Sequence, residues 1–342
     1  MYWEDYYGEE AKYPEVEELL KTKDYDFLRI SDKLKDRLIF LTIGGSYAYG
    51  TNTETSDVDI RGCCFNSKTD LLGLSNFEQF VDENTDTVIY SVNKLFPLLI
   101  NCNPNTIELL GNKLDRYFYL NSIGSLLLGN KNLFLSRRCI NSFGGYALAQ
   151  LNRLTNALGK NNNEEGLLEN LQRSLQSNLI SMNTRYNDFE QGSIQYSINN
   201  NELVCNVNLK DFPLNQFNSI LNEQANILKT YHKLNHRNNK KDDNHLCKHA
   251  MHLVRLYQMG IDILEKEEIN TYREGKDHDI LMSIRKGDFL KDEVFTEDFY
   301  TLLKEYQDKF EYAKNNTSLP ANPDMKKIEE LLMFINESGL RN

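Results

Sequence analysis

Residues 41–62 read LTIGGSYAYGTNTETSDVDIRG, and this stretch decides the expected fold. The apolar run at residues 38–43 predicts a strand that leads into Gly44, Gly45 and Ser46. Glycines lack a Cβ atom, so the backbone there can approach a ligand closely. A short helix directly after the serine would offer its free N–H groups and its dipole to a phosphate. These three residues are therefore candidate phosphate-binding residues.

Two aspartates and an arginine follow at alternate positions, beginning eleven residues after the serine: Asp57, Asp59 and Arg61. The sequence predicts a strand at residues 58–65, on which alternate side chains share one face. Two carboxylates about 7 Å apart on that face repel each other unless a cation lies between them. Hard cations such as Mg²⁺ take such oxygen ligands, and the arginine can offset phosphate charge. For the Asp-x-Asp pattern considered alone, the alternative is two exposed aspartates at the end of a strand. The preceding strand and glycine turn favour a metal site.

The spacing of Gly-Ser and Asp-x-Asp resembles the signature of the DNA polymerase β-like nucleotidyltransferase superfamily. The resemblance implies a small mixed sheet and transfer of a nucleoside monophosphate from an NTP by two Mg²⁺ ions, with Mn²⁺ as a possible substitute. It also implies a third carboxylate on a neighbouring strand. Asp86 matches best because it opens a predicted strand, while Asp82 and Glu83 compete with it and a turn role is the alternative. The implied catalytic and metal-binding residues are Asp57, Asp59 and Asp86.

Further motifs narrow the resemblance to the YcgL-like or RlaP-like branch of the superfamily, which is linked to RNA repair. The resemblance extends over nearly the whole chain, except for residues 188–210 and the polar loop at 235–244. The motifs are NKL at 93–95, NPNTIELL at 103–110, FGGYA at 143–147 and KHAMHLVRL at 248–256.

The last of these motifs carries a stripe of basic side chains. Lys248, His252 and Arg255 stand at i, i+4 and i+7 of a predicted helix, within an arc of about 60°. They are candidate nucleotide-binding residues together with Gly44–Ser46 and Arg61, and a solvated helix face is the alternative. His245 and His249 share helical spacing with His252, but no acidic or cysteine partner completes a zinc site there.

The apolar pattern changes near residue 120 from short β-rich and helical runs to mostly helical sequence. We therefore expect an α+β fold, with a mixed-sheet nucleotidyltransferase domain at 1–120 and a helical domain at 121–342. One hairpin is expected inside the helical half, at 193–198 and 203–209. The remaining expected strands are 38–43, 58–65, 77–81 and 87–92. The expected helices are 94–101, 106–110, 138–158, 165–177, 214–234, 245–264, 299–313 and 326–336.

Composition limits the expected partners and location. The net charge of −11 argues against nonspecific coating of nucleic acid, although a local basic site is compatible with it. The six cysteines form no Cys-x-x-Cys pair and are typical of the reduced thiols of a cytoplasmic protein. We expect no signal peptide and no membrane association, since no apolar run approaches the length of a span.

The sequence therefore favours a nucleotidyltransferase that uses an NTP, such as ATP, and an acceptor hydroxyl. The link to RNA repair favours an RNA end as the acceptor. The acidic net charge favours a small acceptor, or an RNA end that is bound at only a few phosphates. Nucleotidylation of a protein or a small molecule is an alternative, as in a toxin-like modifier. A catalytically inactive nucleotide-binding module is the alternative from another class. The sequence does not identify the NTP, the acceptor or the oligomeric state.

Overall fold

The computed structural model describes most of the chain, in two compact units. The described residues are 13–161, 193–199, 202–214, 217, 220–222, 225, 243–292 and 294–341. The first unit consists of Met1–Gln150, Ala250–Phe289 and Phe295–Asn342, and the second of Leu151–His249 and Leu290–Val294. The expected domain boundary near residue 120 stays a prediction.

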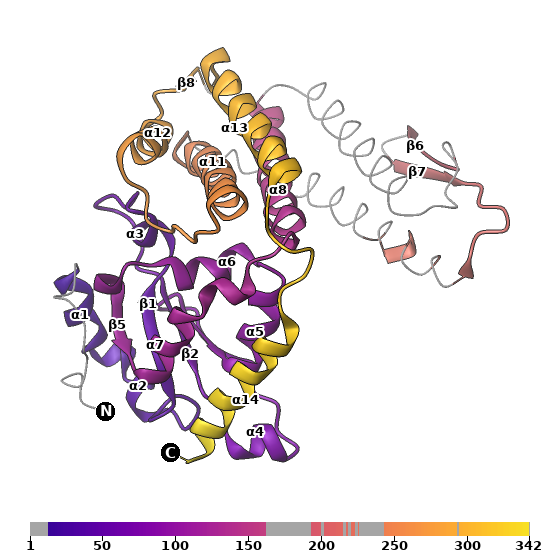
Figure 1. The fold of residues 1–342 in the computed structure, drawn as a ribbon. Coiled ribbons are helices and arrows are strands. Elements are labelled where there is room, and N and C mark those ends of the chain that lie inside the picture. Colours follow the sequence, from indigo (N-terminus) through magenta and orange to yellow (C-terminus); the bar gives the residue numbers. More distant parts are fainter. Residues whose placement is uncertain are drawn as a thin grey trace. The chain divides into compact units, whose positions relative to one another are not determined.

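A five-stranded mixed sheet forms the centre of the first unit (Figure 1). Its order is β3-β4-β2-β1-β5; β2 and β4 are parallel, and the other neighbours are antiparallel. The predicted α+β class is thereby confirmed. The strands are β1 Leu38–Ile43, β2 Ile60–Cys64, β3 Gln79–Asp82, β4 Thr87–Ser91 and β5 Tyr117–Leu120.

Strand β1 lies between β2 and β5 and is buried along its whole length. This explains why its sequence, LIFLTI, is an almost unbroken apolar run rather than an alternating one. Its bounds agree with the prediction. By contrast, β2 begins at Ile60 and not at residue 58, because β1 ends at Ile43, its partner in the ladder. One further bond, from Gly44 N to Asp59 O at 2.8 Å, closes that end of the pair.

Strand β5 was not predicted. It spans only four residues, reads YFYL and lacks apolar–polar alternation. It forms an edge of the sheet, pairing antiparallel with β1 through Phe40 and Leu120, which are 80 positions apart in sequence. Such a strand is defined by its distant partner more than by its own residues.

Helices make up most of the remaining described chain. The long predicted helices near 138, 245, 299 and 326 are confirmed, and the helix predicted at 165–177 lies outside the described residues, as does most of the one at 214–234. None of the described helices is long and apolar enough to cross a membrane. The helices are α1 Pro14–Leu20, α2 Phe27–Ile30, α3 Gly45–Tyr49, α4 Lys68–Leu72, α5 Val92–Ile100, α6 Pro104–Ile107, α7 Ser122–Gly129, α8 Arg138–Asn161, α11 Asp243–Lys266, α12 Gly275–Lys286, α13 Glu297–Asn316 and α14 Met325–Arg341; short 3-10 helices span Lys23–Tyr25, Glu108–Gly111, Leu114–Arg116 and Lys131–Phe134.

Two hairpins complete the described elements. Strands β6 Ile194–Asn199 and β7 Glu202–Val207 pair antiparallel, which confirms the hairpin expected in the helical half. The much shorter β8 Leu290–Lys291 and β9 Val294–Phe295 form the other two-stranded sheet. Most of the polar loop at 235–244 lies outside the described residues.

The C-terminal helix α14 returns to the sheet-bearing part of the first unit, where it lies beside α5 (Figure 1). Asn336 of α14 donates from Nδ2 to Oδ1 of Asn93 in α5, at 3.0 Å. Gly339 packs against the ring of Phe65, since a Cβ atom at that glycine would lie 2.6 Å from the Cδ1 atom. The chain therefore buries part of its N-terminal core with its last helix.

Helix α4 begins with a reciprocal capping box. Ser67 Oγ accepts from the backbone N–H of Asp70 at 3.1 Å, and the Asp70 carboxylate accepts from Ser67 N at 2.9 Å. Partial burial raises the pKa of Asp70, but hydrogen bonds from Ser67 and Ser75 outweigh it and lower the pKa from 3.8 to about 2. Because the folded-state pKa lies below the unfolded one, the ionised carboxylate stabilises the fold above about pH 4, and this stabilisation disappears as the pH falls toward 2.

We expect Asp70→Asn to lower the free energy of unfolding at pH 7 by about 1 kcal/mol, the usual value of a helix cap. The difference between wild type and variant should shrink as the pH falls from about 4 toward 2. Urea unfolding of both proteins across this range measures it. A difference that stays constant down to the lowest pH at which both proteins fold would show that the ionised carboxylate is not its source.

Candidate active site

Helix α3 follows β1 directly and begins at Gly45, earlier than the sequence indicated. Gly45 has a φ of 57°, in the left-handed region that favours glycine. A Cβ atom there would lie 1.8 Å from Oδ2 of Asp59, and one on Gly44 would lie 2.9 Å from Cγ of Arg61. The two glycines are therefore required by the side chains packed against them. The first turn of this helix, with the half-buried Ser46, leaves backbone N–H groups free for a ligand.

The parallel pairing of β2 and β4 brings Asp59 and Asp86 together. Ile60 is the partner of Thr87, so the residues immediately before them are neighbours at the same end of the two strands. Asp86 occupies the turn between β3 and β4 with a φ of 45°, a conformation that aspartate tolerates better than most residues. The register thus places side by side two carboxylates that are 27 positions apart in sequence.

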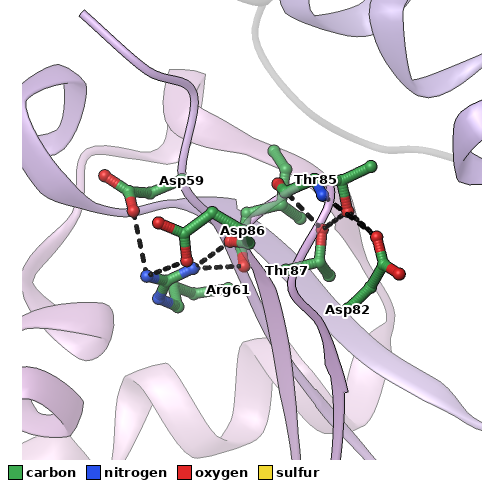
Figure 2. A network of polar contacts seen from close by, with 7 residues as sticks. Asp59, Arg61, Asp82, Thr85, Asp86 and Thr87 are labelled. Carbon is green, nitrogen blue, oxygen red and sulfur yellow. Dashed lines mark hydrogen bonds and ion pairs between the residues drawn. The ribbon is translucent and has the colours of Figure 1, made fainter.

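Arg61 lies between these two carboxylates (Figure 2). Its Nη2 is 3.0 Å from Oδ1 of Asp59 and 3.1 Å from Oδ1 of Asp86. Its Nη1 donates to the carbonyl oxygens of Ile60, at 3.0 Å, and of Asp86. One guanidinium therefore joins both carboxylates and the turn that carries the second of them.

The competing carboxylate Asp82 has a different role. It accepts from the backbone N–H of Thr85 at 3.0 Å and from its hydroxyl at 2.7 Å, inside the same turn (Figure 2). Thr85 in turn is hydrogen-bonded to Thr87 at 2.8 Å. Asp82 closes the β3–β4 turn, whereas Asp86 faces Arg61. The third candidate, Glu83, is exposed.

The donor chemistry of the site suits a hard divalent cation, although a complete ligand set is not assembled. Asp59 and Asp86 supply carboxylate oxygens that converge on one positive charge, and their side chains are 20% and 58% exposed. Asp57, two residues before Asp59, is exposed. Within the described ranges no group of three or more His, Cys, Asp or Glu residues is arranged to hold a metal ion.

The three residues of the predicted basic stripe on α11 differ in how far they are buried. Lys248 belongs to the second unit and is exposed, and half-buried His252 meets the ring of Tyr49 edge-on, with ring centres 6.4 Å apart. The side chain of Arg255 is only 5% exposed, and its Nη1 donates to Oε2 of Glu108 at 2.9 Å. Nucleotide binding by the three stripe residues stays a prediction.

The sequence provides no clear indication of which residues contact the C-terminal end of α3. The segment after α11 wraps this end: Arg273 N donates to Tyr49 O at 3.1 Å, and His278 Nε2 lies 2.9 Å from Gly50 O. The ring of Tyr272 packs where a Cβ atom of Gly50 would stand, 2.2 Å from its Cε2. Since these contacts join positions more than 200 residues apart, neither local pattern nor spacing predicts them.

Residues 19–167 match the family model described as RlaP, an RNA repair pathway DNA polymerase beta family. The candidate site lies within the matched residues. The predicted resemblance to the RlaP-like branch is confirmed over this range, which includes the whole five-stranded sheet, α3 and the three aspartates. The motif at 248–256 lies outside the matched range, so the resemblance predicted there stays a prediction. This match indicates a polymerase β-like nucleotidyltransferase region linked to RNA repair. No curated protein and no solved structure matches the chain.

Proposed function

We propose that this protein is a Mg²⁺-dependent nucleotidyltransferase that transfers a nucleoside monophosphate from an NTP to the hydroxyl of an RNA end. The observation that carries the proposal is the convergence of Asp59 and Asp86 on Arg61, directly beside the glycines that begin α3. The RlaP match supports the RNA acceptor. Transfer to a protein or a small molecule is the second candidate, supported by the net charge of −11.

The first turn of α3 would bind the triphosphate. Its backbone N–H groups and the hydroxyl of Ser46 are suitable donors, and Gly44 and Gly45 remove the side chains that would keep a phosphate away. Arg61 would balance phosphate charge from the adjacent strand β2. His252, on the part of α11 that belongs to the first unit, is a further candidate for a triphosphate contact because it carries a basic group.

Asp57, Asp59 and Asp86 would hold two Mg²⁺ ions, or Mn²⁺ in their place. When bound, such ions activate the attacking hydroxyl and stabilise the leaving pyrophosphate. Arg61 holds two of the carboxylates close together, which lowers the repulsion that would otherwise separate them. The chain itself therefore brings these two carboxylates together at one end of the parallel strands.

The test is a nucleotidyl-transfer assay on the full chain with Mg²⁺ and each of the four NTPs, labelled in turn. Short RNAs with a free 3′ hydroxyl, small alcohols and protein acceptors are offered separately. We expect pyrophosphate release together with label on the RNA. Label on the protein or the small alcohol would select the second candidate. Binding of NTP without pyrophosphate release, whatever the acceptor, would identify a catalytically inactive nucleotide-binding module.

The third carboxylate can be assigned with two matched variants in the β3–β4 turn. We expect Asp86→Asn to lower the transfer rate by about 10- to 100-fold or more, because mutation of even an outer-shell partner of a metal ligand costs about that much. Asp82→Asn should leave the rate within about twofold and lower only the unfolding temperature, because its carboxylate bonds to Thr85. Initial rates of pyrophosphate release and thermal melts measure both effects. The opposite ranking would transfer the assignment to Asp82.

A further inference from the structure

A buried ionic cluster lies against the C-terminal end of α3, opposite the end that begins with Gly44 and Gly45. Glu108 Oε2 accepts from the hydroxyl of Tyr49 at 2.7 Å and from Nη1 of Arg255 at 2.9 Å. The guanidinium carbon of Arg255 also lies 3.7 Å from the centre of the Tyr49 ring. Each member therefore contacts both of the others. They come from three elements: α3, the 3-10 helix at Glu108–Gly111 and α11.

The cluster is closed to solvent. The side chains of Arg255 and Glu108 are 5% and 8% exposed, and Tyr49 is 3% exposed. Burial raises the pKa of the Tyr49 hydroxyl well above its usual value, against the lowering effect of Arg255, so the phenol stays protonated and donates its hydrogen bond. The cost of removing a buried ion pair from water offsets much of its Coulombic gain, so such a pair is weak evidence for added stability. This makes a positioning role the natural function of the cluster.

The cluster connects directly to the candidate site through a short, stiff path. Tyr49 is the last residue of α3, and the helix is five residues long, which corresponds to about 7.5 Å. Its first residue, Gly45, packs against the carboxylate of Asp59. A displacement of Tyr49 would therefore shift both the free amides of the first turn and the carboxylate packed against it.

We propose that Arg255, Glu108 and Tyr49 form a positioning cluster that fixes α3 and, through it, the phosphate-binding turn and Asp59. The inference rests on the proposed function for its consequence in catalysis, but the mechanical coupling stands on the contacts alone. Arg255 then acts through Tyr49 instead of touching the nucleotide. Because the Arg255 side chain is only 5% exposed, contact with a phosphate would require the packing around its guanidinium to open.

Tyr49→Phe is the primary variant, because it removes only the hydroxyl that bonds to Glu108 and keeps the ring under the guanidinium. Arg255→Lys is the second variant; it keeps the charge but loses the flat group that stacks on the ring. The matched control is Tyr257→Phe. Tyr257 is also a buried tyrosine, on α11, but its hydroxyl is hydrogen-bonded to the side chain of Gln307 on α13, and its ring packs against Phe310 of the same helix.

Hydrogen–deuterium exchange of the full chain tests the coupling without any assumption about activity. In Tyr49→Phe and Arg255→Lys, amides of residues 44–51 should exchange about fivefold faster or more, as expected for the loss of one buried hydrogen bond. The control should leave this segment unchanged. Unchanged exchange of 44–51 in both cluster variants would overturn the proposal.

Kinetics then separate positioning from general stability. At a temperature well below unfolding, kcat/KM for the NTP should fall by about tenfold in Tyr49→Phe, mainly through kcat, because small misplacements in a site are costly. Tyr257→Phe should keep kcat although its unfolding temperature falls similarly. Equal loss of kcat in the control would reduce the cluster to a structural role. Faster exchange at 44–51 in the cluster variants, together with a wild type that never releases pyrophosphate, would refute the proposed function and leave the coupling intact.

Discussion

Asp59→Asn is expected to lower nucleotidyl transfer by about a thousandfold or more without unfolding the protein. The amide has the shape of the carboxylate, so it can still pack against Gly45 and remain near Arg61. What it loses is the negative charge that a bound cation requires. Removal of several kcal/mol of charge stabilisation in the transition state corresponds to a rate loss of this size.

Pyrophosphate release under Mg²⁺ saturation measures the effect, and circular dichroism with thermal melting shows that the fold persists. Asp26→Asn is the matched control, since Asp26 pairs with Arg29 at 2.7 Å in the short helical stretch before β1. Loss of such a partly exposed pair costs about 1 kcal/mol of stability or less and should leave the rate unchanged. An Asp59→Asn protein that kept a tenth of wild-type activity would exclude the carboxylate from the metal site.

The parts of the site predicted from the sequence are those encoded locally. Strand β1 is an almost unbroken apolar run, Gly44 and Gly45 stand at the start of α3, and Asp59 and Arg61 lie two positions apart. Each of these features depends on the chemistry of a few adjacent residues. The predicted start of β2, at residue 58, lies two residues before the observed one at Ile60, because the start depends on where the partner strand β1 ends.

The parts that were missed depend on pairing at a distance. Glu108 and Arg255 are 147 positions apart, and neither residue shows in its own surroundings that the other lies beside it. Helical spacing places Arg255 and Lys248 on one stripe, but the helix does not determine what covers each end of that stripe. In the structure Arg255 is buried under Tyr49 and Glu108, while Lys248 is exposed. Helical periodicity predicts which residues share a face, but it does not predict which of them are buried and paired with another side chain.

Gly45→Ala is expected to reduce activity by about a hundredfold or more and to destabilise the fold by roughly 1–2 kcal/mol. The stability cost comes from the left-handed backbone, which any side chain makes unfavourable. The activity cost has a different origin: the new Cβ atom would stand 1.8 Å from Oδ2 of Asp59, so the carboxylate must move. Misplacement of a reacting group by about 1 Å is enough for a hundredfold loss.

Gly275→Ala separates these two effects. Gly275 has a φ of 55°, almost the same as the 57° of Gly45, but a Cβ atom there would meet nothing within 4 Å. Both variants should therefore lower the urea midpoint by similar amounts, while only Gly45→Ala slows pyrophosphate release. If the two variants lost activity equally, backbone strain would account for the effect, and the contact between Gly45 and Asp59 would not set the geometry of the site.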